Sequence, residues 1–111
     1  QFGRPLADFQ GLQFRLADRA TDLEAAEALV RWSGVAPDAD RARRGALLAV
    51  RAAKAAAYDA IQIFGGVGFV REYPVEKRLR DVQTVEGFLV RPGRLAVELA
   101  RSVAPNPARA K

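Results

Sequence analysis

The chain has 111 residues, enough for one domain and too few for two. Half of the residues are apolar and 28% are charged, which is ordinary for a globular protein with a core. Cys, Met and His are absent, which excludes disulfides, thiolate or imidazole metal sites and catalysis by Cys or His. We therefore expect no metal site.

The chain carries neither an apolar run of the roughly 18 residues that a membrane span needs nor a signal-peptide pattern. We expect a cytoplasmic protein without membrane attachment. Because the chain begins with Gln1 rather than Met, we also expect a piece of a longer polypeptide.

The net charge of +5 comes mainly from arginine, with 15 Arg against 3 Lys. Such a balance suits phosphate or another anionic partner. However, only Arg41, Arg43 and Arg44 form a cluster, and no aromatic residue lies among them. A nucleic-acid surface is therefore weakly supported, and we expect solvated helix faces and no nucleic-acid partner.

Helices are expected throughout, because 22 residues are alanine and no stretch alternates with the period of a strand. The first helix is predicted from Pro5 or Leu6 to about Ser33, and Gly34 and Pro37 end it. Phe14 and Trp32 lie off its apolar stripe and are expected to face a second partner. The stripe itself recurs at steps of three and four residues: Phe9, Leu12, Leu16, Ala20, Leu23, Ala26 or Glu27, and Val30.

Three further helices are predicted. The second begins near Asp38 or Asp40, either of which can cap its N-terminus, and ends near Phe64. The third runs from Val75 to Val85 or Phe88. A break at Pro92-Gly93 precedes the fourth, from Arg94 to Val103. Two long and two short helices predict an all-α chain with an up-down four-helix bundle over residues 1–103, followed by a flexible tail over 104–111.

The turn after the second helix is the most informative segment. It reads Gln62-Ile63-Phe64-Gly65-Gly66-Val67-Gly68-Phe69. Three glycines in four residues break the helix and expose backbone amides, and a phosphate or a flat ring can approach because no Cβ intervenes. On physical grounds alone, however, a glycine turn between helices is more often only a turn.

The order of residues in three motifs resembles the C-terminal domain of the acyl-CoA dehydrogenases, flavoenzymes that oxidise acyl-CoA to 2-enoyl-CoA. The opening Gln1-Phe2-Gly3-Arg4-Pro5-Leu6 looks like the Gln-Phe-Gly-x-Pro-Ile/Leu of the family. Leu16-Ala17-Asp18 resembles its Leu-Ala-Asp-Met signature, with Arg19 in place of Met. The glycine turn and the following segment through Asp81 complete the resemblance.

The resemblance implies a four-helix bundle that forms the third domain of a larger FAD-containing subunit. It also implies a homodimer, a tetramer or a heteromer with a related subunit, in which this domain completes the FAD site of a neighbour. Gln62 and the backbone of Gly65 and Gly66 would meet the ADP part of FAD, and Phe2 would lie near its adenine or ribose. The fragment alone is expected to be inactive.

The position of the catalytic base departs from the family pattern. Many members place a Glu in Glu-Gly-Thr, with seven residues between Arg-Asp and that Glu, whereas only four separate Asp81 from Glu86 here. A gapless reading instead puts Leu89 at the base position. Either Glu86 is the base after a deletion, or this position lacks a base, which then comes from an earlier helix or is absent in a non-catalytic partner subunit.

Three classes of function therefore remain. The leading one is a domain of an FAD-dependent acyl-CoA dehydrogenase that acts on an acyl-CoA substrate. The second is a helical assembly module without catalysis. The third is a basic nucleic-acid-binding bundle, whose binding would weaken steeply with added salt.

Overall fold

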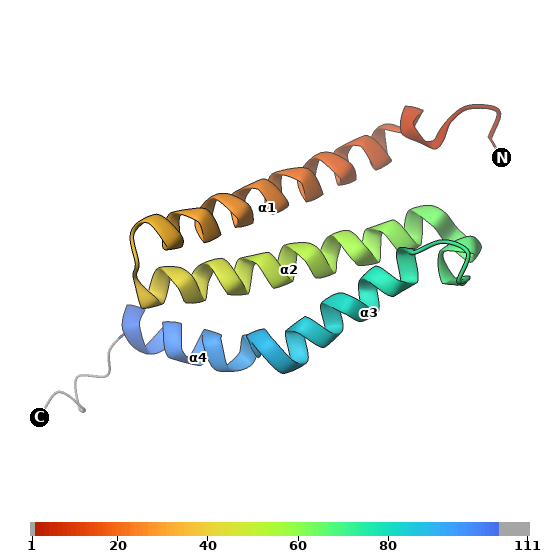
Figure 1. Ribbon diagram of the computed structural model, residues 1–111. Coiled ribbons are helices and arrows are strands. Elements are labelled where there is room, and N and C mark those ends of the chain that lie inside the picture. Colours follow the sequence, from red (N-terminus) through yellow and green to blue (C-terminus); the bar gives the residue numbers. More distant parts are fainter. Residues whose placement is uncertain (1, 105–111) are drawn as a thin grey trace, which may run out of the picture.

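The structure is a computed structural model that describes residues 2–104, and these residues form four α-helices and no strand (Figure 1). The predicted all-α, four-helix architecture is confirmed. Gln1 and residues 105–111, most of the predicted tail, lie outside the described residues. In chain order the elements are η1 (Leu6–Asp8), α1 (Gln10–Val35), α2 (Ala39–Phe64), η2 (Gly65–Phe69), α3 (Val75–Val85), η3 (Glu86–Val90) and α4 (Pro92–Val103).

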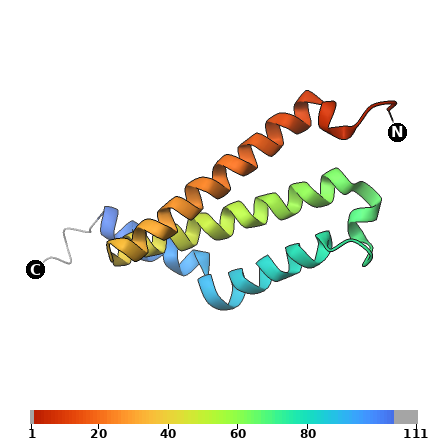
Figure 2. The same cartoon turned by 45° about the horizontal axis from the view of Figure 1, so that its top comes forward.

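The second helix, α2, is the central element. α1 runs antiparallel to it on one side, while α3 and α4 follow each other along the opposite side (Figure 1). α1 diverges from α2 towards the C-terminal end of α2 (Figure 2). The radius of gyration is 17.8 Å, against about 13 Å for a compact domain of this length. The molecule is therefore an open, elongated array built on α2.

The buried apolar residues are few and lie mostly on α2. No large side chain among the described residues is fully buried. The buried set consists of Ala26, Leu47, Val50, Ala52, Ala57, Ile61, Val75 and Leu99. Because five of these eight belong to α2, the core is the surface of this helix together with what the other helices place against it.

The predicted apolar stripe of α1 contacts α2 only in part, at Ala26 and Val30, which corrects the expectation of one continuous apolar stripe. Leu16, Leu23 and Val30 are between 42% and 49% exposed, whereas Ala26 is buried. Two contacts between α1 and α2 are well defined. The guanidinium of Arg19 lies 3.3 Å from the carboxylate of Asp59, and the backbone at Gly45 is so near to α1 that an added Cβ would lie 3.3 Å from Val30 Cγ2. α1 therefore meets α2 through apolar contacts at Ala26 and Val30 and through an ion pair at Arg19.

Helix boundaries agree with the predictions at α2 and α3 and differ elsewhere. α1 begins at Gln10, because Phe9 is extended and separates it from the short turn η1. α3 ends at Val85 but continues as a π-helical turn, η3, which the sequence did not predict. The break before α4 lies at Arg91, whose φ of 47° is left-handed, and Pro92 begins the helix instead of breaking it.

The start of α2 is capped as predicted. A side-chain oxygen of Asp38 accepts a hydrogen bond from the backbone N–H of Arg41 at 2.6 Å. The guanidinium of Arg41 lies 3.9 Å above the ring of Trp32 and donates to the carbonyl oxygen of Ala36. Arg41 therefore joins the end of α1 to the start of α2.

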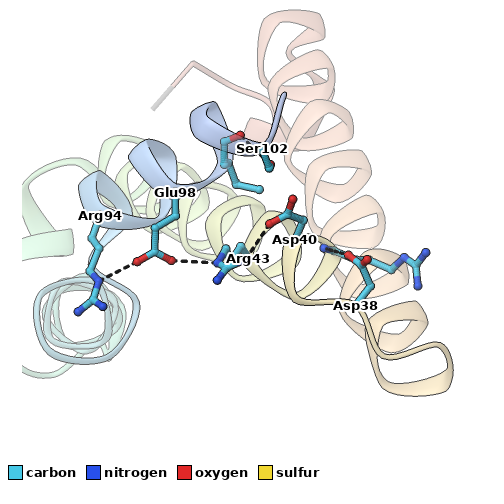
Figure 3. A network of polar contacts seen from close by, with 8 residues as sticks. Asp38, Asp40, Arg43, Arg94, Glu98 and Ser102 are labelled. Carbon is cyan, nitrogen blue, oxygen red and sulfur yellow. Dashed lines mark hydrogen bonds and ion pairs between the residues drawn. The ribbon is translucent and has the colours of Figure 1, made fainter. Parts of the chain in front are cut away.

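A polar network fastens α4 to the beginning of α2 (Figure 3). Arg43 donates from Nε to Glu98 at 2.9 Å and from Nη1 to Asp40 at 2.7 Å, and Arg94 donates to Glu98 at 2.9 Å. The hydrogen bonds from Arg94 and then Arg43 lower the pKa of Glu98. The Ser102 hydroxyl and then Arg43 lower the pKa of Asp40. Both carboxylates are thereby held ionised.

The close packing around Gly68 predicts that any added side chain would clash with its neighbours. A Cβ at Gly68 would lie 3.0 Å from the carbonyl oxygen of Ile61 and 3.3 Å from its Cα, both backbone atoms that cannot yield easily. We expect Gly68→Ala to lower the free energy of unfolding by about 1–3 kcal/mol, measured by thermal and urea denaturation. Gly66→Ala is the matched control, because nothing lies within 4 Å of its added Cβ. Equal stability of the two variants would contradict the close contact.

The polar network predicts that Glu98 contributes to the stability of the fold and that this contribution depends on pH. Because folding lowers the pKa of Glu98 below its ordinary value of 4.5, this contribution is complete above that value and disappears as the pH falls through the lowered pKa. We expect Glu98→Gln to be less stable than the wild type at pH 7, with a gap in melting temperature that closes towards pH 3. Glu24→Gln, at an exposed acid with no ion pair in the described residues, should show no such closure. A gap independent of pH would contradict the role of Glu98.

Candidate functional site

The end of α2 places Gln62 and two glycines on an open surface. Gln62 lies in the last turn of α2 and is exposed, as are Gly65 and Gly66, which begin the turn η2. Gly65 adopts φ 61° and ψ −138°, a conformation that residues with a Cβ rarely adopt. The backbone therefore reverses sharply beside an amide side chain that is accessible from solvent.

The three glycines of this turn have different roles. Gly65 is required by its backbone angles, and Gly68 is buried against Ile61. Gly66 has neither constraint, because its φ is not positive and an added Cβ would meet nothing within 4 Å. Packing within this chain thus accounts for two of the glycines, and Gly66 leaves room for an external group to approach the backbone.

The second group of candidate residues lies at the N-terminus. Phe2 is 65% exposed and meets the ring of Phe9 edge to face, with 5.7 Å between ring centroids. The guanidinium of Arg4 lies 4.0 Å above the Phe9 ring. An open pocket of about 450 Å³ is lined by Phe2, Leu6, Phe9, Gln10, Gly11, Leu12 and Arg15. Aromatic faces with adjacent arginines suit a flat, anionic ligand.

These two groups occupy the same end of the molecule, where the N-terminal segment and the η2 turn both lie (Figure 1). α1 and α2 diverge there (Figure 2), and the pocket beside Phe2 is not lined by Gln62, Gly65 or Gly66, so the two groups do not share that pocket. A ligand bound by both would be extended. Residues outside this chain would have to form its remaining contacts.

Glu86 and Leu89 lie at the opposite end of α3, in the π-helical turn η3. Glu86 Oε2 accepts a hydrogen bond from Lys54 Nζ of α2 at 2.7 Å, and the side chain of Glu86 is 28% exposed. Leu89 is 78% exposed and the adjacent Phe88 is 77% exposed. The two candidates for the base position therefore face different surroundings, Glu86 towards α2 and Leu89 towards solvent.

An apolar groove of about 350 Å³ lies between α2 and this last part of the chain. It is lined by Ala46, Ala49, Val50, Ala53, Asp81, Val82, Val85 and Val90. The alanines of α2 form one wall, and the valines of α3 and η3 form the other. The sequence did not predict this groove, because its two walls come from elements far apart in the chain.

The side chains of the described residues limit which metal or cofactor this chain could bind. The described residues contain no cluster of three or more acidic side chains with metal-binding spacing. Among the residues that the structure describes, no helix combines enough length and apolar character to cross a bilayer. The exposed amide of Gln62, the open backbone at Gly66 and the exposed ring of Phe2 are groups that suit a nucleotide, through hydrogen bonding, close backbone approach and ring contact.

Comparisons with known proteins identify a matching family and similar relatives. A family model described as acyl-CoA dehydrogenase, C-terminal domain, matches residues 1–88. A 3-sulfinopropanoyl-CoA desulfinase from Variovorax paradoxus is 44% identical over 87 residues, which cover 75% of this chain and 22% of the relative. An acyl-CoA dehydrogenase from Bacillus subtilis is 44% identical over 94 residues, which cover 78% of this chain and 24% of the relative.

A solved structure agrees at the level of the fold. A chain from a structure described as the electron transferring flavoprotein of Acidaminococcus fermentans superposes with a TM-score of 0.88 at 32% identity. The superposition covers 96% of this chain and 29% of that chain. The chain thus spans under a third of the length of each of these proteins. The family match ends at Phe88, immediately before Leu89.

Proposed function

Because the chain belongs to the acyl-CoA dehydrogenase family and matches its C-terminal domain, we propose that it completes an FAD site in an acyl-CoA-oxidising flavoprotein. The observation that carries this proposal is the exposed turn from Gln62 to Gly66 within the matched residues, where Gly66 is required by neither backbone angle nor packing. The proposed substrate is an acyl-CoA thioester, and the proposed product is a 2-enoyl-CoA.

We propose that Gln62 and the backbone of Gly65 and Gly66 contact the ADP part of FAD, and that Phe2 lies against its adenine or ribose. FAD, when bound, supplies the acceptor for the hydride that leaves the acyl chain. The residues of this chain bind and orient the nucleotide. The substrate pocket and the rest of the FAD site belong to the larger polypeptide and its partner subunits, so the chain alone is proposed to be inactive.

A non-catalytic role is the second candidate, and the segment around Leu89 favours it. The gapless reading puts an exposed leucine where many relatives carry the base, and the match to the family ends one residue earlier. Such a subunit would support the flavin site of a related catalytic subunit. The Variovorax relative is named for loss of a sulfinate group from a CoA thioester, so 3-sulfinopropanoyl-CoA belongs among the tested substrates.

The decisive experiment uses the intact polypeptide, purified without a companion subunit. Acyl-CoA thioesters are added in the absence of oxygen while the absorption band of the oxidised flavin is followed. We expect bleaching with at least one thioester. Bound flavin that stays oxidised with every thioester, with no sulfite released from 3-sulfinopropanoyl-CoA, would favour the non-catalytic subunit. A preparation that holds no flavin would contradict a self-sufficient enzyme.

A variant of the turn tests the cofactor contact separately from folding. Gly66→Ala places a Cβ where nothing in this chain lies within 4 Å, so we expect stability without FAD to change by no more than about 0.5 kcal/mol. The affinity for FAD should fall by about tenfold or more, because the methyl group occupies the space needed for the nucleotide. Fluorescence titration of the apoprotein with FAD measures this change.

The matched control for that variant is Gly93→Ala in the first turn of α4. Its added Cβ also meets nothing within 4 Å, and Gly93 lies outside the proposed FAD contacts. We expect its FAD affinity to equal that of the wild type. An equal loss in both variants, or no loss in Gly66→Ala, would argue against FAD contact at the turn.

We also propose that the chain contributes to self-association. Phe14 and Trp32 are 62% and 55% exposed on α1, and the open array buries no large side chain fully among the described residues. Exposed apolar surface of this kind is typically covered by a partner. Sedimentation of the intact polypeptide should give a dimer or tetramer, and a monomer at high concentration would contradict this proposal.

A further inference from the structure

An ion pair joins the middle of α2 to the first residue of η3. Lys54 Nζ lies 2.7 Å from Glu86 Oε2, and their side chains are 36% and 28% exposed. The hydrogen bond with Glu86 raises the pKa of Lys54 above its ordinary value, so Lys54 remains protonated at neutral pH. The carboxylate of Glu86 is therefore engaged within this chain.

The Lys54–Glu86 ion pair joins two different elements, whereas several other ion pairs of the chain lie within a single helix. Lys77 and Asp81 pair at 2.6 Å within α3, four residues apart. Such a pair supports its own helix but holds no other element in place. Lys54 and Glu86 are 32 residues apart, and their contact fixes the junction between α3 and α4 on α2.

The junction needs such a contact because its backbone is irregular. Glu86 begins the π-helical turn, and its carbonyl oxygen accepts the N–H of Arg91 at 2.9 Å. Arg91 has a φ of 47°, which is unfavourable for a residue with a Cβ. Phe88 and Leu89, at the tip of the turn, are more than three-quarters exposed. The position of the tip therefore depends on the two ends of the turn. Glu86 contributes to both ends, because its side chain pairs with Lys54 and its carbonyl oxygen accepts the N–H of Arg91.

We propose that Glu86 is a positioning residue whose ion pair with Lys54 fixes the π-helical turn and thereby holds Phe88 and Leu89, of which the gapless reading puts Leu89 at the base position. This inference rests on the proposed function, and it assigns Glu86 an anchoring role rather than that of the base that removes the substrate proton. The proton acceptor then lies elsewhere in the polypeptide or in a partner subunit.

The first test measures the position of the turn by hydrogen exchange in the intact flavoprotein. Removing a partly exposed ion pair in Lys54→Met or Glu86→Gln should accelerate exchange of the amides of residues 86–91 by about two- to fivefold. The double variant Lys54→Glu/Glu86→Lys restores the pair with its charges exchanged and should recover the wild-type rates. Unchanged exchange in both single variants would overturn the anchor.

The matched control is Lys77→Met, which removes the same charge from an ion pair within α3. It should leave exchange of residues 86–91 at the wild-type rate. If Lys77→Met accelerates exchange there as much as Lys54→Met does, the effect is one of general charge and the proposal fails.

The second test separates an anchor from a base by the rate of flavin reduction with acyl-CoA. For an anchor, Lys54→Met and Glu86→Gln lower the rate by the same factor, below about tenfold, and the charge-exchanged double variant recovers it. If Glu86 were the base, the rate would fall by about 10²–10⁴-fold in Glu86→Gln alone. The double variant Lys54→Glu/Glu86→Lys, in which the carboxylate lies on α2, would not recover it. That result overturns the proposal. If wild-type flavin is reduced by no thioester, the proposed function fails, and hydrogen exchange alone decides the anchor.

Discussion

The structure depends on the surface of α2, because each of the other helices reaches the core by packing against it. Gly45, Ala52 and Ala57 are buried on this helix, and a Cβ at Gly45 would already press on Val30. Small side chains let a neighbouring helix approach closely, but they bury little apolar area per residue. The buried apolar area is therefore small, and ion pairs also join α2 to its neighbours at defined places, with Asp59 facing α1, Arg43 facing α4 and Lys54 facing η3. This explains why an open, elongated array retains definite helix positions.

The same helix also determines where a ligand could bind. Its last turn carries Gln62, and the left-handed Gly65 turns the chain back so that Gly68 packs on Ile61. This reversal leaves Gly66 at the outer side of the turn. In the proposed FAD site, this chain would form one face of the site and the opposite face would come from elsewhere.

Much of this fold could be predicted from local sequence signals. Asp38 caps α2, Gly65 ends it, and Pro74 precedes α3, because each signal acts within a few residues of itself. The face of α1 could not be predicted, since periodicity identifies the apolar residues of a helix but not which neighbour covers them. Leu16 and Leu23 are exposed, whereas Arg19 of the same helix forms an ion pair with Asp59. The π-helical turn, closed by a hydrogen bond from the Arg91 N–H to the Glu86 carbonyl oxygen, was not predicted because apolar periodicity does not distinguish it from the end of an α-helix.

The candidate site was predictable to a similar extent. The glycine turn was recognised from its residues, but only the structure separates Gly66, which has no packing role within the chain, from Gly65 and Gly68. At the base position the sequence left two readings, Glu86 after a deletion or Leu89 without one. Residues three apart share a face of an α-helix, but residues 86–90 form a π-helical turn, in which the two positions do not coincide. Here Glu86 faces Lys54 on α2, whereas Leu89 is exposed. A carboxylate at position 86 could take over the role of one at 89 only if the whole turn repacked and its ion pair with Lys54 were broken.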